Sequence, residues 1–484
     1  TDVLADTALE VIPDSVAVLP FANLNPDGEN TLFALGLHDE VINQLTKIRS
    51  LNVIARNSVL TLVDQELPLP EIRRLLRVES VMTGTILFAD SQARINLQLL
   101  DPTSGVSFWA GTYEADIGNL DAMLEIQSDI ALHVAEALEA EIRQSEQALI
   151  TSRPTESFEA YRYNLAARNA HYQQDYAMEW SLVKQALELD PNYVDAWLLF
   201  ASLNTVLVGT PLPGMSSRDH FELGLQSAER SIELAPDNSQ GYALKAVALG
   251  TSKDWEGVAE AVDTLLNMDT PLSELKYVSL LLLCLGDFDR AIEIYEANLI
   301  TEPLNLYGRG FLMAALEMAG RREDAQREYL IGEELNPVWW GDTVNVFLAL
   351  GRDDALRDID DLVGISAELK ALLHRVDEPE AVRSAVFAYL DKPDKISAEA
   401  LFYSALAAHI GELEVSVQLL RESLQDVWTG LHWYWLPLFD EARQLDSFKQ
   451  LLNESGLVDY WNQHGWPKVC RPLEEGFSCD WTAY

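Results

Sequence analysis

The residues of this chain that could carry chemistry do not form a recognisable catalytic arrangement. No nucleophile elbow, phosphate loop, zinc-protease helix or dinucleotide fingerprint occurs in the 484 residues. The nearest match is residues 23–28 (Asn-Leu-Asn-Pro-Asp-Gly), which copy the first half of a calcium-binding EF-hand loop. The twelfth position of that loop requires a bidentate glutamate, and Ala34 stands there. We therefore expect a polar turn after a strand, and a protein that is not an enzyme.

Two further groups of ligand-type side chains are poorly arranged for a metal. His38, Asp39 and Glu40 are consecutive on a predicted helix, so they point in different directions. We expect them to be surface or partly satisfied helix residues. Five aspartates between 353 and 361 could hold a cation, but a solvated helix face is the interpretation we favour. We predict no metal and no cofactor.

The three cysteines divide into one core residue and one pair. Cys284 lies in an apolar helical stretch and is predicted to be a small core residue. Cys470 and Cys479 are separated by eight residues, whereas a redox motif has two, and no further ligand pair for zinc stands nearby. A structural disulfide and two free thiols remain as alternatives. We favour the disulfide, which would indicate an oxidising compartment.

The balance of charge limits the partners. Seventy-seven acidic residues against 34 basic ones give a net charge of −43. This argues against binding of nucleic acid or an anionic membrane surface, because phosphate binding needs clustered cations. We interpret the charge as a solvated acidic coat, with an acidic groove that attracts a cationic ligand as the alternative. The purest apolar run, residues 280–285, is too short to span a bilayer.

The elements that must position any binding residue are best seen in a 34-residue pattern that is written twice between 272 and 337. A glycine, an alanine, a tyrosine and a proline recur at the same offset. They are Gly286, Ala291, Tyr295 and Pro303, then Gly320, Ala325, Tyr329 and Pro337. Glycine can end a first helix, alanine permits close packing, and proline stops the second helix. The pattern resembles the tetratricopeptide repeat (TPR), a helical hairpin that stacks into solenoids.

Weaker copies of this pattern extend over residues 158–427, including one at 398–423 with Gly411 in its turn. We expect about six or seven hairpins. Residues 428–484 are rich in tryptophan and tyrosine. We predict that they cap the last hydrophobic face of the solenoid and are held by the cysteine pair.

The chain before the repeats predicts a small α/β domain. Residues 1–12 read as a leader or linker, residues 13–143 as the domain, and residues 144–157 as a linker. Strands are expected at 15–21, 51–55, 80–89, 93–100 and 106–114, and helices at 32–48, 70–78 and 120–143. The clearest strand is 93–100, in which Ile95, Leu97 and Leu99 alternate with polar residues. The predicted fold class is thus multidomain, α/β followed by all-α.

Six segments of this domain carry a family resemblance. They are residues 15–21 (Ser-Val-Ala-Val-Leu-Pro-Phe), 36–41 (Gly-Leu-His-Asp-Glu-Val), 51–56 (Leu-Asn-Val-Ile-Ala-Arg), 81–86 (Val-Met-Thr-Gly-Thr-Ile), 96–101 (Asn-Leu-Gln-Leu-Leu-Asp) and 108–113 (Phe-Trp-Ala-Gly-Thr-Tyr). In this order they resemble the TolB-amino-terminal-like domain, and residues 456–470 resemble the ends of the same TolB-like/TPR proteins. The resemblance implies the extracytoplasmic part of a membrane regulator, as in CadC-like transcription activators or class III nucleotide cyclases. It implies no catalytic residues.

The repeat pattern also predicts which side chains face a binding groove. In TPR arrays the second, fifth, ninth and twelfth positions of the first helix line the concave surface. In the first unit these are Tyr161, Asn164, Arg168 and His171. In the two clear units the polar or aromatic ones are Ser273, Lys276, Tyr307 and Glu317. This mixture suits a peptide or a small polar ligand.

We therefore expect a non-catalytic sensory or interaction region of a membrane-tethered bacterial regulator that binds a protein, a peptide or a small polar ligand. The compartment would be the periplasm, with the membrane reached through a segment upstream of Thr1, since the start lacks the features of a signal peptide. A homodimer is compatible with this expectation. The alternative is a free-standing scaffold or assembly factor that holds one protein partner.

Overall fold

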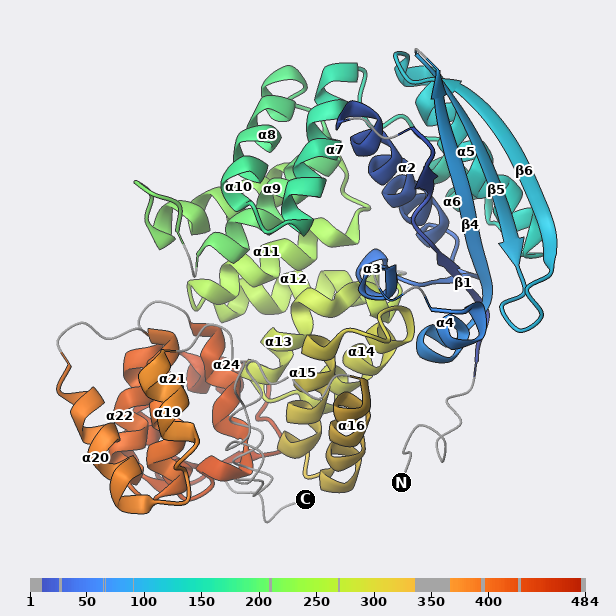
Figure 1. The fold of residues 1–484 in the computed structure, drawn as a ribbon. Helices are drawn as coiled ribbons and strands as arrows, with labels where there is room; N and C mark the ends of the chain where they lie inside the picture. The colour runs from blue at the N-terminus through green and yellow to red at the C-terminus, as the bar shows by residue number, and fades with distance from the viewer. Residues whose placement is uncertain are drawn as a thin grey trace.

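The computed structural model shows a mostly helical molecule with a small α/β region at its N-terminal end (Figure 1). It describes residues 11–25, 28–63, 65, 67–89, 91–208, 211–268, 270–335, 366–392, 397–424 and 428–479. Most of the predicted leader, Pro337 and the aspartates at 353–361 lie outside the described residues. None of the described helices has the length and apolar character needed to cross a bilayer.

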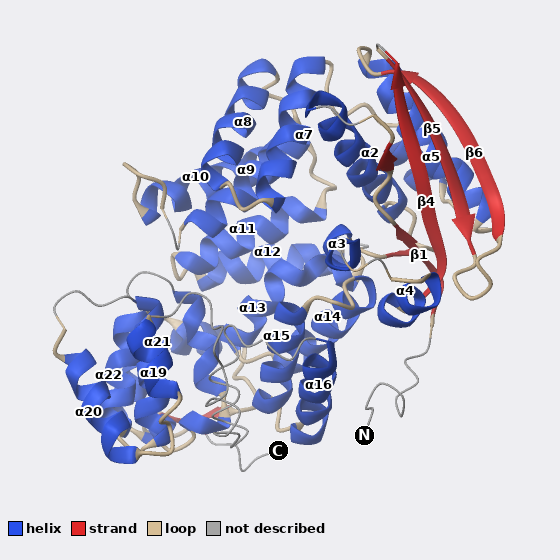
Figure 2. Ribbon diagram, in the orientation of Figure 1, coloured by secondary structure: helices blue, strands red, loops and turns tan. Residues whose placement is uncertain are grey.

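The N-terminal region contains one mixed sheet (Figure 2). Its strands are β1 (Ile12–Val18), β2 (Ala22–Asn23), β3 (Asn52–Val53), β4 (Val78–Ala89), β5 (Gln92–Leu100) and β6 (Ser107–Asp116). The order is β3-β1-β4-β5-β6, and β2 pairs with β4. β1 runs parallel to β3 and β4, whereas β4, β5 and β6 are antiparallel neighbours. Ile95, Leu97 and Leu99 are buried, as the alternation predicted.

Helices cover the two faces of the sheet unequally. Helices α2 (Gly28–Thr46) and α5 (Leu120–Ala137) pack on one face, and the shorter α3 (Arg56–Val63) and α4 (Leu69–Leu76) pack beside β1 and β4. The helix that we expected to reach Arg143 ends at Ala137, and a separate helix, α6 (Gln144–Ile150), lies in the predicted linker. This helix forms because Glu146 caps its first turn and Ile150 is fully buried in the domain core.

Helical hairpins follow, in the order that the repeats predicted. They are α7 (Phe158–Tyr172) with α8 (Tyr176–Leu189), α9 (Val194–Leu207) with α10 (Ser217–Leu234), α11 (Ser239–Thr251) with α12 (Trp255–Asn267), α13 (Lys276–Leu285) with α14 (Phe288–Thr301), and α15 (Leu306–Met318) with α16 (Arg322–Leu335). Gly286 ends α13 at φ 85°, in the left-handed region that favours glycine. Ala291 and Ala325 are fully buried between helices, as expected for the small position of each repeat.

The C-terminal part forms a second helical group. It contains α19 (Ala367–Leu373), α20 (Pro379–Leu390), α21 (Ser397–His409), α22 (Leu413–Ser423), the 3-10 segments η3 (Trp428–Trp435), η4 (Pro437–Phe439) and η5 (Ala442–Gln444), the helices α23 (Asp446–Glu454) and α24 (Leu457–His464), and a short hairpin of β7 (Cys470–Pro472) and β8 (Phe477–Cys479). α21 and α22 form a hairpin whose turn has Gly411 at φ 79°, in agreement with the predicted unit at 398–423.

The aromatic tail has two contact surfaces rather than one. It packs against α21 and α22, the last hairpin, as expected of a cap. In addition, η3 packs against α11 and α13, and α24 packs against α12, so the tail returns to the middle of the hairpin stack (Figure 1). Phe311 of α15 stacks on Trp433 with ring centroids 5.8 Å apart.

Candidate binding groove

An open cavity of about 550 Å³ lies between helix α2 and the first helices of the hairpins, α7, α9 and α11. We call this cavity the candidate groove. Its polar lining comes from both the α/β region and the repeats. The side chains that matter below are Asn43, Lys47, Asn164, Arg168, Asp195 and Ser202. A cavity of this size is in the range of ordinary ligand sites.

Arg168 of α7 joins the repeats to the α/β region at one end of the groove. Its Nε lies 3.1 Å from Asp39 Oδ2 and its Nη1 donates to Glu40 Oε1 at 2.5 Å. The carboxylates stand on α2, and all three side chains are largely buried. Burial raises the pKa of Glu40, while the Arg168 guanidinium lowers it. Arg168 is therefore a predicted groove residue that also fixes the position of α2.

The same cluster extends away from the groove through two more side chains. Tyr172 donates its hydroxyl to Asp39 Oδ1 at 3.1 Å, and burial raises the pKa of this tyrosine to about 12. The Arg56 guanidinium lies over the Tyr172 ring, 3.8 Å from its centroid. Asp39 and Glu40 were expected at the surface or partly satisfied, and the structure corrects this. They are buried because the repeats cover α2.

His38, the third member of that run, is also buried, inside the α/β region. Its Nε2 donates to the backbone oxygen of Val18 at 2.8 Å, and burial lowers its pKa. Its Nδ1 has no hydrogen-bond partner among the described residues, so the surface alternative is wrong for His38 and the partly satisfied alternative holds. Within the described residues, no group of three or more metal-ligating side chains is close enough to hold an ion.

Asn164 lies on the floor of the groove with half of its amide unsatisfied. Its side chain is 1% exposed, and its Nδ2 donates to the Tyr193 hydroxyl at 3.1 Å. Its Oδ1 has no hydrogen-bond partner among the described residues. A buried polar atom without a partner costs about 1–3 kcal/mol, so Asn164 is a polar group of the groove wall whose hydrogen bonding is incomplete.

The other predicted groove residues of α7 behave differently from one another. His171 lines the groove, and its Nδ1 donates to Glu179 Oε2 at 3.0 Å. Tyr161 does not line it, and this prediction is wrong in its position. The tyrosine is 1% exposed, packs with Leu120 and Met123 of α5, and accepts a hydrogen bond from Gln127 Nε2 at 2.7 Å. The neighbouring α/β region buries it.

The predicted groove residues of the later hairpins are not brought into this cavity. Ser273 is half-buried in the short 3-10 segment before α13, and Lys276 pairs with Glu302 at 2.8 Å. Tyr307 is 64% exposed at the start of α15, and Glu317 is 1% exposed and lies 3.6 Å from Arg322. Of α13 only Tyr277 reaches the lining, and α15 contributes no residue to it.

Sequence reasoning missed the wall that α2 contributes. Asn43, Gln44 and Lys47 line the groove opposite the repeats, but nothing local in the sequence marks them, because their role depends on how the α/β region docks. The Asp195 carboxylate of α9 was missed for a different reason. It stands 34 residues after Tyr161, but groove positions were selected only in the first unit and in the two clear units.

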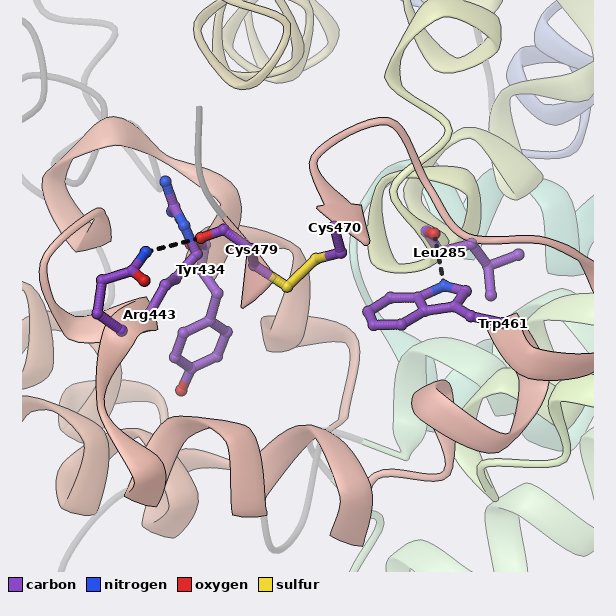
Figure 3. The surroundings of a disulfide bond; sticks show 7 residues. Leu285, Tyr434, Arg443, Trp461, Cys470 and Cys479 are labelled. Atoms are coloured by element: carbon purple, nitrogen blue, oxygen red, sulfur yellow. Dashed lines mark hydrogen bonds between the residues drawn. A yellow bond between two sulfur atoms is a disulfide. The ribbon is translucent and has the colours of Figure 1, made fainter. Parts of the chain in front are cut away.

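The cysteines lie in the C-terminal cap, which contributes no residue to the groove lining (Figure 3). Cys470 and Cys479 form a disulfide that joins β7 to β8. Gln444 Nε2 donates to the backbone oxygen of Cys479 at 2.9 Å, and Arg443 Nη1 donates to the oxygens of Tyr434 and Leu436 at 2.5 and 2.9 Å. Burial lowers the pKa of Arg443 to about 9. These bonds hold the tail together around the disulfide.

Comparison with known proteins gives limited relationships. No family model matches the chain. A protein of Rhizobium meliloti (strain 1021) named "Putative adenylate cyclase 3" is 28% identical over 240 residues, which make up 49% of this chain and 40% of that protein. The chain thus spans about two-fifths of that relative's length. A crystal structure of MamA matches 37% of this chain and 92% of its own, at 19% identity and a TM-score of 0.26. A MamA mutant matches similarly, at 20% identity and a TM-score of 0.25.

Proposed function

We propose that this chain is a non-catalytic binding region of a larger bacterial regulator and that it takes a peptide or a small polar ligand in the candidate groove. The observation that carries this proposal is the Asn164 amide in the lining of the groove, whose buried oxygen has no hydrogen-bond partner among the described residues. An amide in the wall of a cavity is a group that can pair with a peptide backbone. The helical hairpins around it supply a rigid wall of the kind that suits peptide recognition.

The groove also has the composition that a polar ligand needs. Amide side chains from three helices line it, namely Asn43, Gln44, Asn164, Asn238 and Gln240. Amides offer both donors and acceptors, so they can match a peptide backbone in several registers. The cavity lies at the junction of the two regions, where a bound ligand would contact both α2 and the repeats. Binding would therefore stabilise one arrangement of the α/β region against the repeats.

The larger protein is proposed to be a membrane-tethered regulator whose binding region lies outside the cytoplasm. The resemblance of residues 13–140 to the TolB-amino-terminal-like domain supports this, as does the Cys470–Cys479 disulfide, which an oxidising compartment permits. The Rhizobium relative, which carries the name of a cyclase, is longer than the part that matches. Intact mass and terminal sequencing of the protein from its own cells test this part. A longer chain with a membrane span and a cyclase or DNA-binding domain would support it, and a native start at Thr1 would favour the free-standing scaffold.

The groove itself is tested with a library of random peptides and two matched tryptophan substitutions. Ser202 lines the groove on α9, whereas Ser181 is exposed on α8 and lies outside it. Ser202→Trp fills the cavity, so we expect it to abolish retention of the peptides that the wild-type protein selects. Ser181→Trp should leave retention unchanged. Selection of the same peptides by both variants would refute the groove as the site.

A further inference from the structure

We propose that the ligand of the candidate groove is a short zwitterionic peptide, whose carboxylate is bound by Lys47 and whose ammonium is bound by Asp195. This inference rests on the proposed function, since it assumes that the groove is the binding site. It adds the chemical class of the ligand, which is a free peptide with both ends charged rather than an internal segment of a folded protein.

Lys47 is a cation in the groove without a carboxylate partner. Its Nζ donates to Gln44 Oε1 at 2.8 Å and to the backbone oxygen of Leu149 at 3.0 Å, and both acceptors are neutral. It forms no ion pair with any described residue. A primary ammonium has three protons, so one remains for a ligand. Burial lowers the pKa of Lys47, and a bound carboxylate would offset that cost.

Asp195 is the opposite charge on the facing wall. It stands in the first turn of α9, where the helix dipole stabilises an anion, and its carboxylate makes no hydrogen bond or ion pair with any described residue. Burial lowers the pKa of Lys47, and among the nearby charges Asp195 does most to raise it. The two groups therefore interact electrostatically across the groove. They nevertheless form no ion pair with one another.

A pair of opposite charges that share a cavity and do not pair directly matches a ligand that carries both signs. Arg168 already contacts the carboxylates of both Asp39 and Glu40, so Lys47 and Asp195 are the charges of the groove that remain without an ion pair among the described residues. Asn164 belongs to the same groove lining. A zwitterion satisfies both charges at once.

The test uses alanine, dialanine and trialanine with the full chain in titration calorimetry, because the series varies the separation of the two charges. For the tightest binder, three blocked forms are compared: acetylated, amidated, and blocked at both ends. We expect the doubly blocked form to bind at least about tenfold more weakly, as charge-assisted bonds imply. Lys47→Met should weaken only forms with a free carboxylate, and Asp195→Asn only forms with a free ammonium. The matched controls Lys184→Met and Asp263→Asn lie on α8 and α12, outside the groove.

The outcomes separate the two proposals. The zwitterion is supported if Lys47→Met weakens only ligands with a free carboxylate and Asp195→Asn weakens only ligands with a free ammonium. The two control variants should bind every form as the wild type does. Equal affinity for free and fully blocked peptides overturns it and leaves the groove as a peptide site. Failure of all three alanine ligands, while library peptides bind in a way that Ser202→Trp abolishes, also overturns the zwitterion alone. Failure of both the alanine series and the library overturns the groove itself.

Discussion

The indole nitrogen of Trp461 donates to the backbone oxygen of Leu285 at 3.1 Å, although 176 residues separate them in the chain. Leu285 is the last residue of α13, where helical carbonyls have no partner within the helix. A second such bond runs in the opposite sense, from Trp255 Nε1 of α12 to the oxygen of Ser455 at 3.0 Å. The C-terminal group is thus bonded to the centre of the repeats, and the repeat stack is closed by its own tail.

Trp461→Phe should test this closure. The substitution keeps a buried aromatic ring but removes the donor, which leaves the Leu285 oxygen without its partner. We expect a loss of about 1–3 kcal/mol in the free energy of unfolding, measured by urea denaturation. Trp197→Phe is the control, because its indole also bonds to a backbone oxygen, that of Pro191, but near the surface. Equal losses in the two variants would contradict a special role for Trp461.

The disulfide should stabilise the cap measurably. Replacing both Cys470 and Cys479 by serine releases a loop of about ten residues, for which chain entropy predicts a loss of roughly 2–3 kcal/mol. Reductant should lower the melting temperature of the wild-type protein to that of the double variant and should not affect the variant. A wild-type melting temperature that does not change when reductant is added would refute this contribution.

Cys284, whose pKa is raised to about 12 by burial, should resist alkylation until the protein unfolds.

Arg168 should be the most costly single charge to remove. Arg168→Met leaves Asp39 and Glu40 largely buried without the cation that faces them, and breaking a buried pair in this way costs about 3–5 kcal/mol. Arg74→Met is the matched control, since Arg74 pairs with Glu71 on the surface of α4 and such pairs contribute about 0–1 kcal/mol. Thermal unfolding of both variants distinguishes them. A loss no larger than that of the control would show that the cluster does not hold α2.

His38 should make the α/β region sensitive to acid. Its pKa is lowered in the folded chain, chiefly by burial, so below pH 6.5 the unfolded chain binds the proton more tightly. Stability should therefore fall as the pH drops from 6.5 towards the lowered folded pKa, by up to about 1.4 kcal/mol per pH unit. His38→Gln keeps a donor for the Val18 oxygen and cannot titrate. Unfolding at pH 7.5 and 5.5 should show a smaller acid loss in this variant, and identical losses would contradict the assignment.

The parts of the fold that could be predicted from the sequence are those that depend on local periodicity. The alternation of Ile95, Leu97 and Leu99 specified β5, and the glycine at 286 specified the turn between α13 and α14. In both cases, the alternating burial of β5 and the left-handed backbone at Gly286, residues close in the sequence determine the local structure. The prediction of a linker at 144–157 was wrong in part, because α6 forms there. Ile150 of this helix packs into the core of the α/β region, which is distant in the sequence.

The candidate groove was only half predictable for the same physical reason. Asn164, Arg168 and His171 follow from the repeat spacing on α7, which is a local property. Lys47 is brought opposite Asp195 by docking of the α/β region through the Arg168 cluster, and no spacing rule contains that contact. Tyr307 stands on α15, which contributes no residue to the groove lining, and this placement is equally non-local.

Hydrogen exchange measured by mass spectrometry, with and without the tightest peptide from the library, tests the binding claim most directly. We expect added protection in three stretches that line the groove, residues 40–47, 164–171 and 194–202, and no change in α8 or in the cap at 457–479. Protection confined to α8, α10, or the cap would contradict the groove as the binding site.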